Sequence, residues 1–364
     1  MTDQLMSALF AVGSGALLAL LLFLPFVFLS YRRHGRLDPL RLLLWIGFLV
    51  YAMALWTYTL LPLPDPEAIR CTSAQLRPFQ FLDDISTTAV ATGASLPHNP
   101  AFLQVVLNVL LFMPLGFFLR VLWGRGILIS AAAGLLISLS IETTQITGVW
   151  GIYPCAYRVF DVDDLLANTF GALLGAVLVS LLWLLRRRLL PSAAQASRAG
   201  APAPGPITAG RRLTGMVCDV LSALLLSVAC AVLTNAWQMH LGRHGDALDG
   251  SLTQQVAFWV PFVLLGLITL VSGRTVGDLA VRIRFRSTAG GAPLNLPGRA
   301  GRYLAGIGAY QLTDLLPGSW APAAALLLVV ASLTAVLMRR SRAGLPGLAT
   351  ASEPQDDAPH PDPR

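Results

Sequence analysis

Long apolar runs separated by short polar segments dominate the chain. Each run is close to 20 residues long, which is the length that a helix needs to cross a hydrocarbon core. Most of the runs lack the polar stripe of a helix at the surface of a soluble domain. A shorter apolar segment near 302–316 is expected to be re-entrant, interfacial or a ninth element. We predict eight spans, at about 8–30, 42–62, 101–122, 127–148, 164–185, 213–236, 255–272 and 321–338.

The composition agrees with a protein that resides in a bilayer. Hydrophobic residues make up 55% and charged residues 12% of the 364 residues, and the mean hydropathy is +0.65. A soluble domain usually carries about 25% charged residues. The composition therefore excludes a soluble enzyme and predicts an all-α fold, a polytopic transmembrane helical bundle.

A stretch rich in Pro, Ala, Gly and Ser divides the chain into two units. Residues 191–209 are predicted to be a flexible cytoplasmic linker. A five-helix domain is expected within 1–190, and a domain of three or four helices within 210–342. Residues 343–364 are rich in proline and lack an apolar period, so we expect a disordered tail. Between 277 and 302 arginines alternate with apolar residues, which predicts an extended segment or hairpin near anionic head groups.

The positive charge predicts orientation rather than nucleic-acid binding. The net charge is +7 and all 26 basic residues are Arg, most of them in the loops between apolar runs. If the N-terminus is outside, 22 arginines are inside and four are outside. Basic residues accumulate on the cytoplasmic side of membrane proteins. We therefore expect the bacterial cytoplasmic membrane, with the N-terminus outside and the C-terminus in the cytoplasm.

Two of the four cysteines fall in the predicted outer loops. Cys71 and Cys155 face the compartment in which disulfides persist, so the alternatives are a Cys71–Cys155 bridge or two unpaired thiols. Cys218 and Cys230 lie inside a span and are expected to be packing residues. The sequence contains no CxxC pair and no redox-cofactor motif, so we expect no metal site and no cofactor.

The polar positions inside the apolar runs gather in three neighbouring spans. Along the fifth span the polar and glycine positions step by three and four residues, so they share one face of a helix. Glu142 and Gln145 share a face of the fourth span in the same way. The stripe of the fifth span consists of Asp161, Asp164, Asn168, Gly171 and Gly175. The predicted topology places Arg158 at the outer mouth. It places six polar residues in the outer half of the bilayer: Asn108, Glu142, Gln145, Asp161, Asp164 and Asn168.

An ionisable residue inside a span is costly, so by default it indicates a functional site. Glu142 and Asp164 are the candidate catalytic groups, each as a general base. Gly171 and Gly175 are expected to let another helix approach closely. The structural alternative is an ion-pair network between Arg158 and the carboxylates that holds three helices together. The candidate ligand-binding residues are Asn108, Gln145, Arg158, Asp161 and Asn168.

The combination of these motifs resembles the VanZ-like family, whose founding member is associated with resistance to the glycopeptide teicoplanin. The likeness covers roughly 40–180 and includes Arg77-Pro78-Phe79 ahead of the third span. The first element is NxxxFxPxG, at Asn108, Phe112, Pro114 and Gly116. The second element is IExxQ, at Glu142 and Gln145, and the third is RxxDxxDxxxNxxGxxxG, which starts at Arg158.

The second unit resembles the RDD family of small membrane domains, named for an Arg and two Asp. Its opening GRRLTGMVCD supplies Arg211, Arg212 and Asp219. The stretch after the family's second span matches at Gly273, Thr275, Gly277 and Arg282. Where the family usually ends in a Gly-Leu-His-Asp-like stretch, this chain has Gly344-Leu345-Pro346-Gly347 and lacks the second Asp.

Three functions fit these observations, and the sequence leaves open whether any reaction is catalysed. The first is an outward-facing site that binds or modifies a membrane lipid or a lipid-linked cell-envelope precursor, with an effect on teicoplanin susceptibility. The second is a scaffold or assembly factor without catalysis. The third is an ion-coupled transporter, which the apolar inner halves of the spans disfavour. Membrane lipids are the expected partners, nucleic acid is not, and the sequence does not define an oligomeric state.

Overall fold

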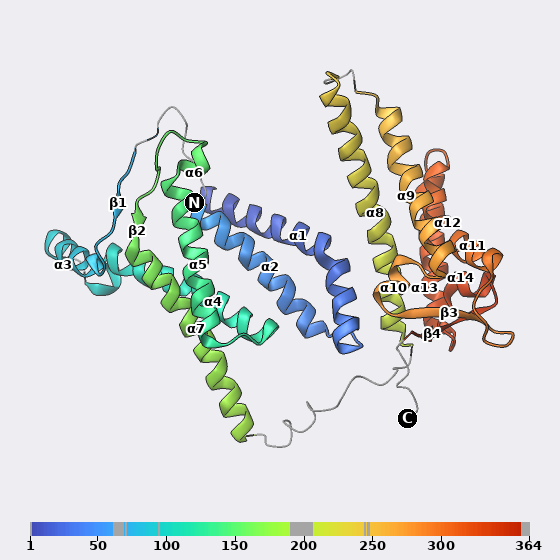
Figure 1. Cartoon of the computed structure of the whole chain (residues 1–364), viewed down its shortest axis with the longest axis horizontal. Helices are drawn as coiled ribbons and strands as arrows, with labels where there is room; N and C mark the ends of the chain where they lie inside the picture. The colour runs from blue at the N-terminus through green and yellow to red at the C-terminus, as the bar shows by residue number, and fades with distance from the viewer. Residues whose placement is uncertain are drawn as a thin grey trace. The chain divides into compact units, whose positions relative to one another are not determined.

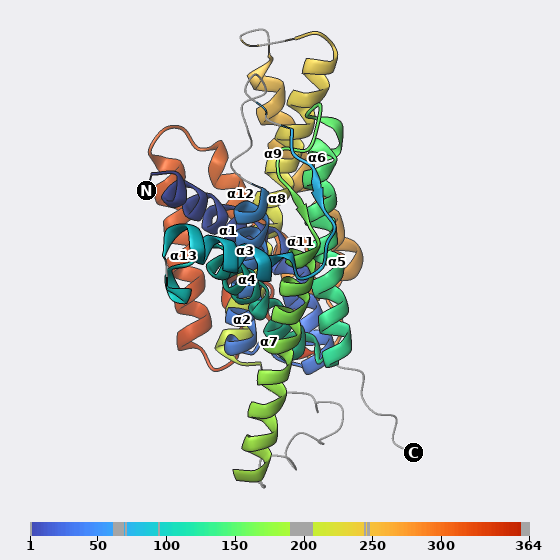
Figure 2. The ribbon, with the colours of Figure 1, turned by 90° about the vertical axis from the view of Figure 1, so that its left-hand side faces the viewer.

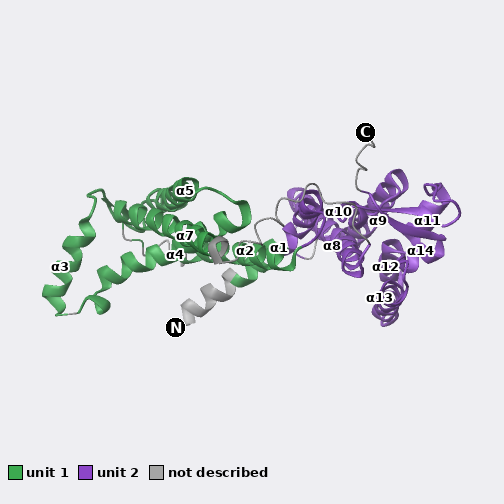
Figure 3. Cartoon of the chain, turned by 90° about the horizontal axis from the view of Figure 1, so that it is seen from below, with its two compact units in different colours: residues 1–19, 38–199 green, residues 20–37, 200–364 purple. Residues whose placement is uncertain are grey.

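The structure is a computed structural model that describes residues 2–60, 69, 71–93, 95–189, 207–243, 245 and 248–357, and it describes side chains only within 12–185 and 207–357. Eight helices in this part of the chain are long and apolar enough to cross a membrane: α1, α2, α4, α5, α7, α8, α9 and α13. They coincide with the eight predicted spans, which confirms the all-α polytopic fold. The chain forms two compact units, coloured separately in Figure 3.

The first unit contains α2 (Pro39–Leu60), α4 (Pro100–Trp123), α5 (Ile127–Ile146) and α7 (Val162–Leu189), joined by short elements (Figure 1). The N-terminal part of α1 (Thr2–His34) also belongs to it. The short elements are β1 (Ala74–Gln75), α3 (Gln80–Thr92), η1 (Leu96–His98), α6 (Gly148–Gly151) and β2 (Phe160–Asp161).

Glycines set the packing of α7 against α4. A Cβ atom at Gly171 would overlap the carbonyl oxygen of Val109, and one at Gly175 would overlap that of Met113. On the other side of the interface, Gly116 in α4 meets the backbone of α7 at Ala172. Because apolar lipid gives helices no hydrophobic reason to associate, such close backbone approach supplies the packing energy. α5 lies beside α7 (Figure 2), where Gly134 contacts Ala172.

The second unit is built on α8 (Ala209–His240), α9 (Gly250–Ser272) and α13 (Trp320–Met338). Near the start of α8, two chain segments form the antiparallel strand pair of β3 (Ile283–Ser287) and β4 (Ser352–Asp356). The remaining elements are α10 (Val276–Ala280), α11 (Leu296–Leu304), α12 (Ile307–Leu312), η5 (Thr313–Leu315) and α14 (Gly344–Ala349). The apolar segment near 302–316 is thus divided among short helices, none of which is long enough to span.

Residues 20–37, which comprise the C-terminal part of α1 and the three residues after it, pack with the second unit rather than the first. Val27 and Tyr31 are buried there in one cluster with Cys218, Val281 and Ile283. The expected first domain of 1–190 therefore differs from the observed unit, which comprises residues 1–19 and 38–199. Apolar periodicity identifies a span but not the partner of each face, so the sequence did not predict this division.

The expectation of a disordered tail from 343 onward is wrong for residues 344–356, which form α14 and β4. β4 pairs with β3 over its whole length, from Ile283 opposite Asp356 to Ser287 opposite Ser352. The alternation of Arg and apolar residues does produce a strand at 283–287, but its partner is the C-terminal segment. Most of the predicted linker, residues 191–206, and the end of the tail lie outside the described residues.

We expect Gly175→Ala to lower the free energy of unfolding by about 1–3 kcal/mol, because overpacking at a tight contact forces backbone shifts. The measurement is thermal stability of the full-length protein in detergent. Gly126→Ala is the matched control, since nothing lies within 4 Å of a Cβ at Gly126. Equal stability of the two variants would contradict the close approach of α7 to α4.

Cys71 and Cys155 form a disulfide with a Cα–Cα distance of 5.5 Å across 84 residues of sequence. We predict that two of the four cysteines resist alkylation in the unfolded, unreduced protein and react after reduction. A Cys71→Ser, Cys155→Ser double variant should lose about 2–4 kcal/mol of stability, since the bridge restricts the unfolded chain. Alkylation followed by mass spectrometry is the measurement, and four reactive thiols before reduction would contradict the bridge.

Candidate functional site

The polar residues predicted from the sequence converge at one end of α4, α5 and α7. Asn108 in α4 donates a hydrogen bond from its Nδ2 to Oδ1 of Asp164 in α7. Asn168, one turn further along α7, donates from Nδ2 to Oγ of Ser138 in α5 at 2.8 Å. Oδ1 of Asn168 is buried and has no hydrogen-bond partner among the described residues. Side-chain hydrogen bonds therefore connect the three helices.

Glu142 lies near the end of α5 with only 4% of its surface exposed. Its Oε2 accepts a hydrogen bond from the backbone N–H of Asp161 at 3.1 Å. Asp161 belongs to β2, which pairs in parallel with β1, and its Oδ1 accepts from Nε2 of Gln75 at 3.1 Å. Burial raises the pKa of Asp161, and the hydrogen bond that its carboxylate accepts from the backbone N–H of Asp163 only partly offsets this. The strand pair thus brings a third carboxyl group close to Glu142.

Arg158 and Gln145 meet at the carbonyl oxygen of Thr59, the penultimate residue of α2. Gln145 donates to this oxygen from Nε2 at 2.7 Å, and Arg158 donates from a guanidinium nitrogen at 3.2 Å. Arg158 is exposed. Among the described residues it forms no ion pair, so the alternative of an Arg158–carboxylate network is not what the structure contains.

Asp163 has a role that the sequence did not reveal. Its two carboxylate oxygens accept hydrogen bonds from the backbone N–H groups of Phe79 at 2.6 Å and Phe81 at 2.8 Å. Phe79 has a φ of 64° at the N-terminus of α3, a strained conformation that these bonds hold in place. The contact between Asp163 and the Arg77-Pro78-Phe79 loop was not predictable, because α3, which follows this loop, has no long apolar run that would identify it.

The arginine–aspartate motif of the second unit forms a separate buried ionic cluster. Arg212 pairs with Asp278 at 2.9 Å, and Arg302 pairs with the other carboxylate oxygen of Asp278. Asp278 is fully buried. Burial alone raises the pKa of Asp278, but the ion pairs with Arg302 and Arg212 outweigh it and hold the pKa below its usual range.

Arg211 and Asp219 complete the cluster from α8. Arg211 pairs with Asp356 at 2.6 Å and also donates to the carbonyl oxygens of Val281 and Arg282. Asp219 accepts hydrogen bonds from Thr275 Oγ1 at 2.9 Å and from the backbone N–H of Gly277 at 2.6 Å. The acids that pair with the two arginines are therefore Asp278 and Asp356.

These two clusters and eight apolar helices define a multi-pass α-helical membrane protein with polar groups placed between its spans. Residues 48–184 match the model of the VanZ/LLP1 family. The match supports the VanZ-like resemblance, which was expected over roughly 40–180. Searches of curated proteins and of solved structures found no match to the chain.

We predict that Asp278→Asn lowers the stability of the second unit by about 3–5 kcal/mol, since two buried guanidinium groups lose their shared counterion. Asp357→Asn is the control: Asp357 also pairs with two arginines, Arg274 and Arg284, but at a side chain that is 25% exposed. Its loss should cost about 1 kcal/mol or less. Chemical unfolding of both variants in the same detergent tests the difference, which should disappear if Asp278 is not buried.

Proposed function

We propose that the first unit binds the head group of a membrane lipid or of a lipid-linked cell-envelope precursor at the cluster around Glu142 and Asp164. The observation that carries the proposal is the lack of an ion pair: no described arginine lies within ion-pair distance of the carboxyl groups of Glu142, Asp161 or Asp164. Carboxyl groups between spans normally pair with one another, with backbone groups or with ligands, because isolated burial is costly. Each of these carboxyl groups accepts at least one hydrogen bond within the unit, and a ligand with donor groups adds the partner that no ion pair supplies.

The chemistry of the cluster favours a head group that carries hydroxyl or amine donors. Carboxylates accept hydrogen bonds and do not donate them. The unpartnered Oδ1 of Asn168 is a further acceptor on the same side of α7. Arg158 is exposed next to Gln145, where a guanidinium group suits a phosphate. A sugar or an amine linked to a phosphate combines both requirements.

If the site is catalytic, Glu142 or Asp164 acts as the general base toward a hydroxyl or amine of the ligand. Glu142 is held by the backbone of Asp161, and Asp164 is held by Asn108. Each hydrogen bond fixes one carboxylate oxygen, as general-base catalysis requires a positioned acceptor.

The proposed orientation makes this cluster face the outside of the cytoplasmic membrane. The distribution of 22 arginines inside and four outside supports it. The Cys71–Cys155 bridge lies on the same side of the unit and belongs in an oxidising compartment. The VanZ/LLP1 match over 48–184 supports a link to the cell envelope, and through the resemblance to teicoplanin susceptibility.

A non-catalytic scaffold is the second candidate, and the hydrogen bonds within the cluster favour it. Asn108, Glu142 and Asn168 each bond to a different element of the same unit.

The second unit is proposed to be an RDD-like membrane domain fused to the first, on the basis of Arg211, Arg212 and Asp219.

We predict that Glu142→Gln and Asp164→Asn preserve folding and change teicoplanin susceptibility, because the amides keep the shape of the carboxyl groups but lose the charge. Binding of lipid-linked precursor extracts to the purified full-length protein should fall by about tenfold or more, the effect of losing a charged hydrogen bond. Folded yield in detergent, precursor retention and susceptibility in cells are measured for each variant.

Asp83→Asn is the control, since Asp83 lies on α3 with its side chain 56% exposed and, among the described residues, forms its ion pair with the exposed Arg77. It should match the wild type in all three measurements. Loss of folded yield in both cluster variants favours the scaffold, and normal folding with unchanged retention contradicts the proposed binding site.

A further inference from the structure

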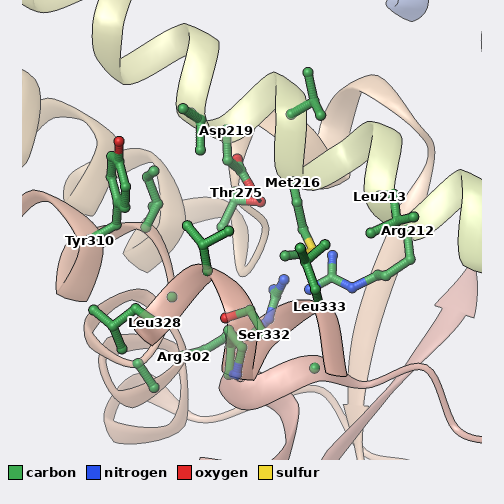
Figure 4. Close-up of a pocket in the computed structure, with 18 of the residues that line it drawn as sticks. Arg212, Leu213, Met216, Asp219, Thr275, Arg302, Tyr310, Leu328, Ser332 and Leu333 are labelled. Carbon is green, nitrogen blue, oxygen red and sulfur yellow. Dashed lines mark hydrogen bonds between the residues drawn. The ribbon is translucent and has the colours of Figure 1, made fainter. Parts of the chain in front are cut away.

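A cavity of about 530 Å³ lies within the second unit, between α8 and α13 (Figure 4). Most of its wall is apolar, with Met216 from α8 and Leu333 from α13 pointing toward each other across it. On α8 the lining extends from Arg212 to Leu221, which corresponds to roughly 14 Å along a helix. Its volume falls within the range of small-molecule binding sites.

Buried arginines form the polar end of this cavity. The side chains of Arg212 and Arg302 are 4% and 1% exposed, and both groups line the cavity. Asp278 accepts a hydrogen bond from one terminal nitrogen of each guanidinium group, and the other terminal nitrogen of Arg302 donates to the carbonyl oxygen of Gly273. The Nε–H of each is buried and has no hydrogen-bond partner among the described residues. Buried donors without an acceptor are costly, and these two belong to arginines that line the cavity.

The charge at this end of the unit indicates the sign of the missing acceptor. Asp219 also lines the cavity, but its carboxylate already accepts hydrogen bonds from Thr275 Oγ1 and the backbone N–H of Gly277. The segments that meet here, 211–219, 274–302 and 339–357, contain eleven arginines and five acidic residues. Arginine edges bind carboxylate and phosphate oxygens better than neutral acceptors.

We propose that the cavity binds an acidic amphiphile, whose carboxylate or phosphate accepts hydrogen bonds from Arg212 and Arg302 and whose hydrocarbon chain lies between α8 and α13. The position of the arginines supports this arrangement. Arg212 is the fourth residue of α8, near the end of its span, and the cavity continues from it into the apolar part of the helix. An amphiphile in a bilayer has the same arrangement, with its polar head group at the interface and its hydrocarbon chain directed into the apolar layer. This site is independent of the cluster in the first unit.

The test uses the purified full-length protein and native mass spectrometry after incubation with single-chain probes. The probes are palmitic acid, 1-palmitoyl lysophosphatidic acid, the neutral 1-palmitoylglycerol, and inorganic phosphate. We expect one equivalent of an acidic probe to be retained at least about tenfold better than 1-palmitoylglycerol, because only a charged head group makes charge-assisted bonds to the arginines. Preference between the two acids identifies a carboxylate or a phosphate as the head group.

Two matched variants on α13 test the location. Ser332 lines the cavity, whereas Thr334 is exposed on the same helix. Ser332→Phe should fill the cavity and lower retention of the acidic probe by about tenfold or more, while Thr334→Phe should retain it like the wild type. Neither variant removes a buried charged group, so a difference in retention between them does not arise from the loss of the ionic cluster.

A third variant tests the head-group contact. Arg212→Lys keeps the positive charge beside Asp278 but removes the Nε–H and the planar guanidinium group. It should reduce the preference for acidic over neutral probes without abolishing binding of the chain. Three results would overturn the proposal. The wild type could retain neutral and acidic probes equally, or Ser332→Phe could leave retention unchanged. The third is that the protein retains inorganic phosphate to the same extent as the acidic amphiphile.

Discussion

The close contact of α7 with α4 is the constraint on which the first unit depends. In a bilayer two apolar helices gain little from hiding their side chains from lipid, so their association relies on shape. Gly171 and Gly175 let the backbone of α7 reach the carbonyl groups of α4. Asn168 and Asp164 lie about one and two turns before Gly171 on the same face. Because the backbones of α4 and α7 lie close together, the side chain of Asn108 on α4 can donate a hydrogen bond to Asp164 on α7.

The eight spans could be predicted because each is a long apolar run with its own internal hydrogen bonds. The glycine and carboxylate stripe of α7 was predictable for a related reason, since a step of three and four residues fixes a shared face. The short elements were not. α3 contains no long apolar run, and β3 finds its partner more than 60 residues later in a segment that is rich in proline. Pairings over such distances leave no periodic signal in a single sequence.

The roles of individual polar residues were harder to predict than their positions. One alternative paired Arg158 with the carboxylates, but Arg158 bonds to the carbonyl of Thr59, which the end of α2 leaves without an intrahelical donor. In the second unit, the sequence did not indicate which acids pair with the arginines of α8. These acids lie on α10 and β4. A residue type in a motif predicts the charge of its environment better than the identity of its partner.

The pairing of β3 with β4 also has a consequence for the synthesis of the protein. At roughly 5–20 residues per second, a ribosome needs about 3 to 13 seconds to make the residues that separate the two strands. During this interval α13 must enter the membrane, while β3 presents an open edge and Arg211 has not yet met Asp356. An unpaired edge is a template for association with other chains. The second unit is therefore most exposed to misassembly late in translation, after its helices are in place and before its last strand has emerged.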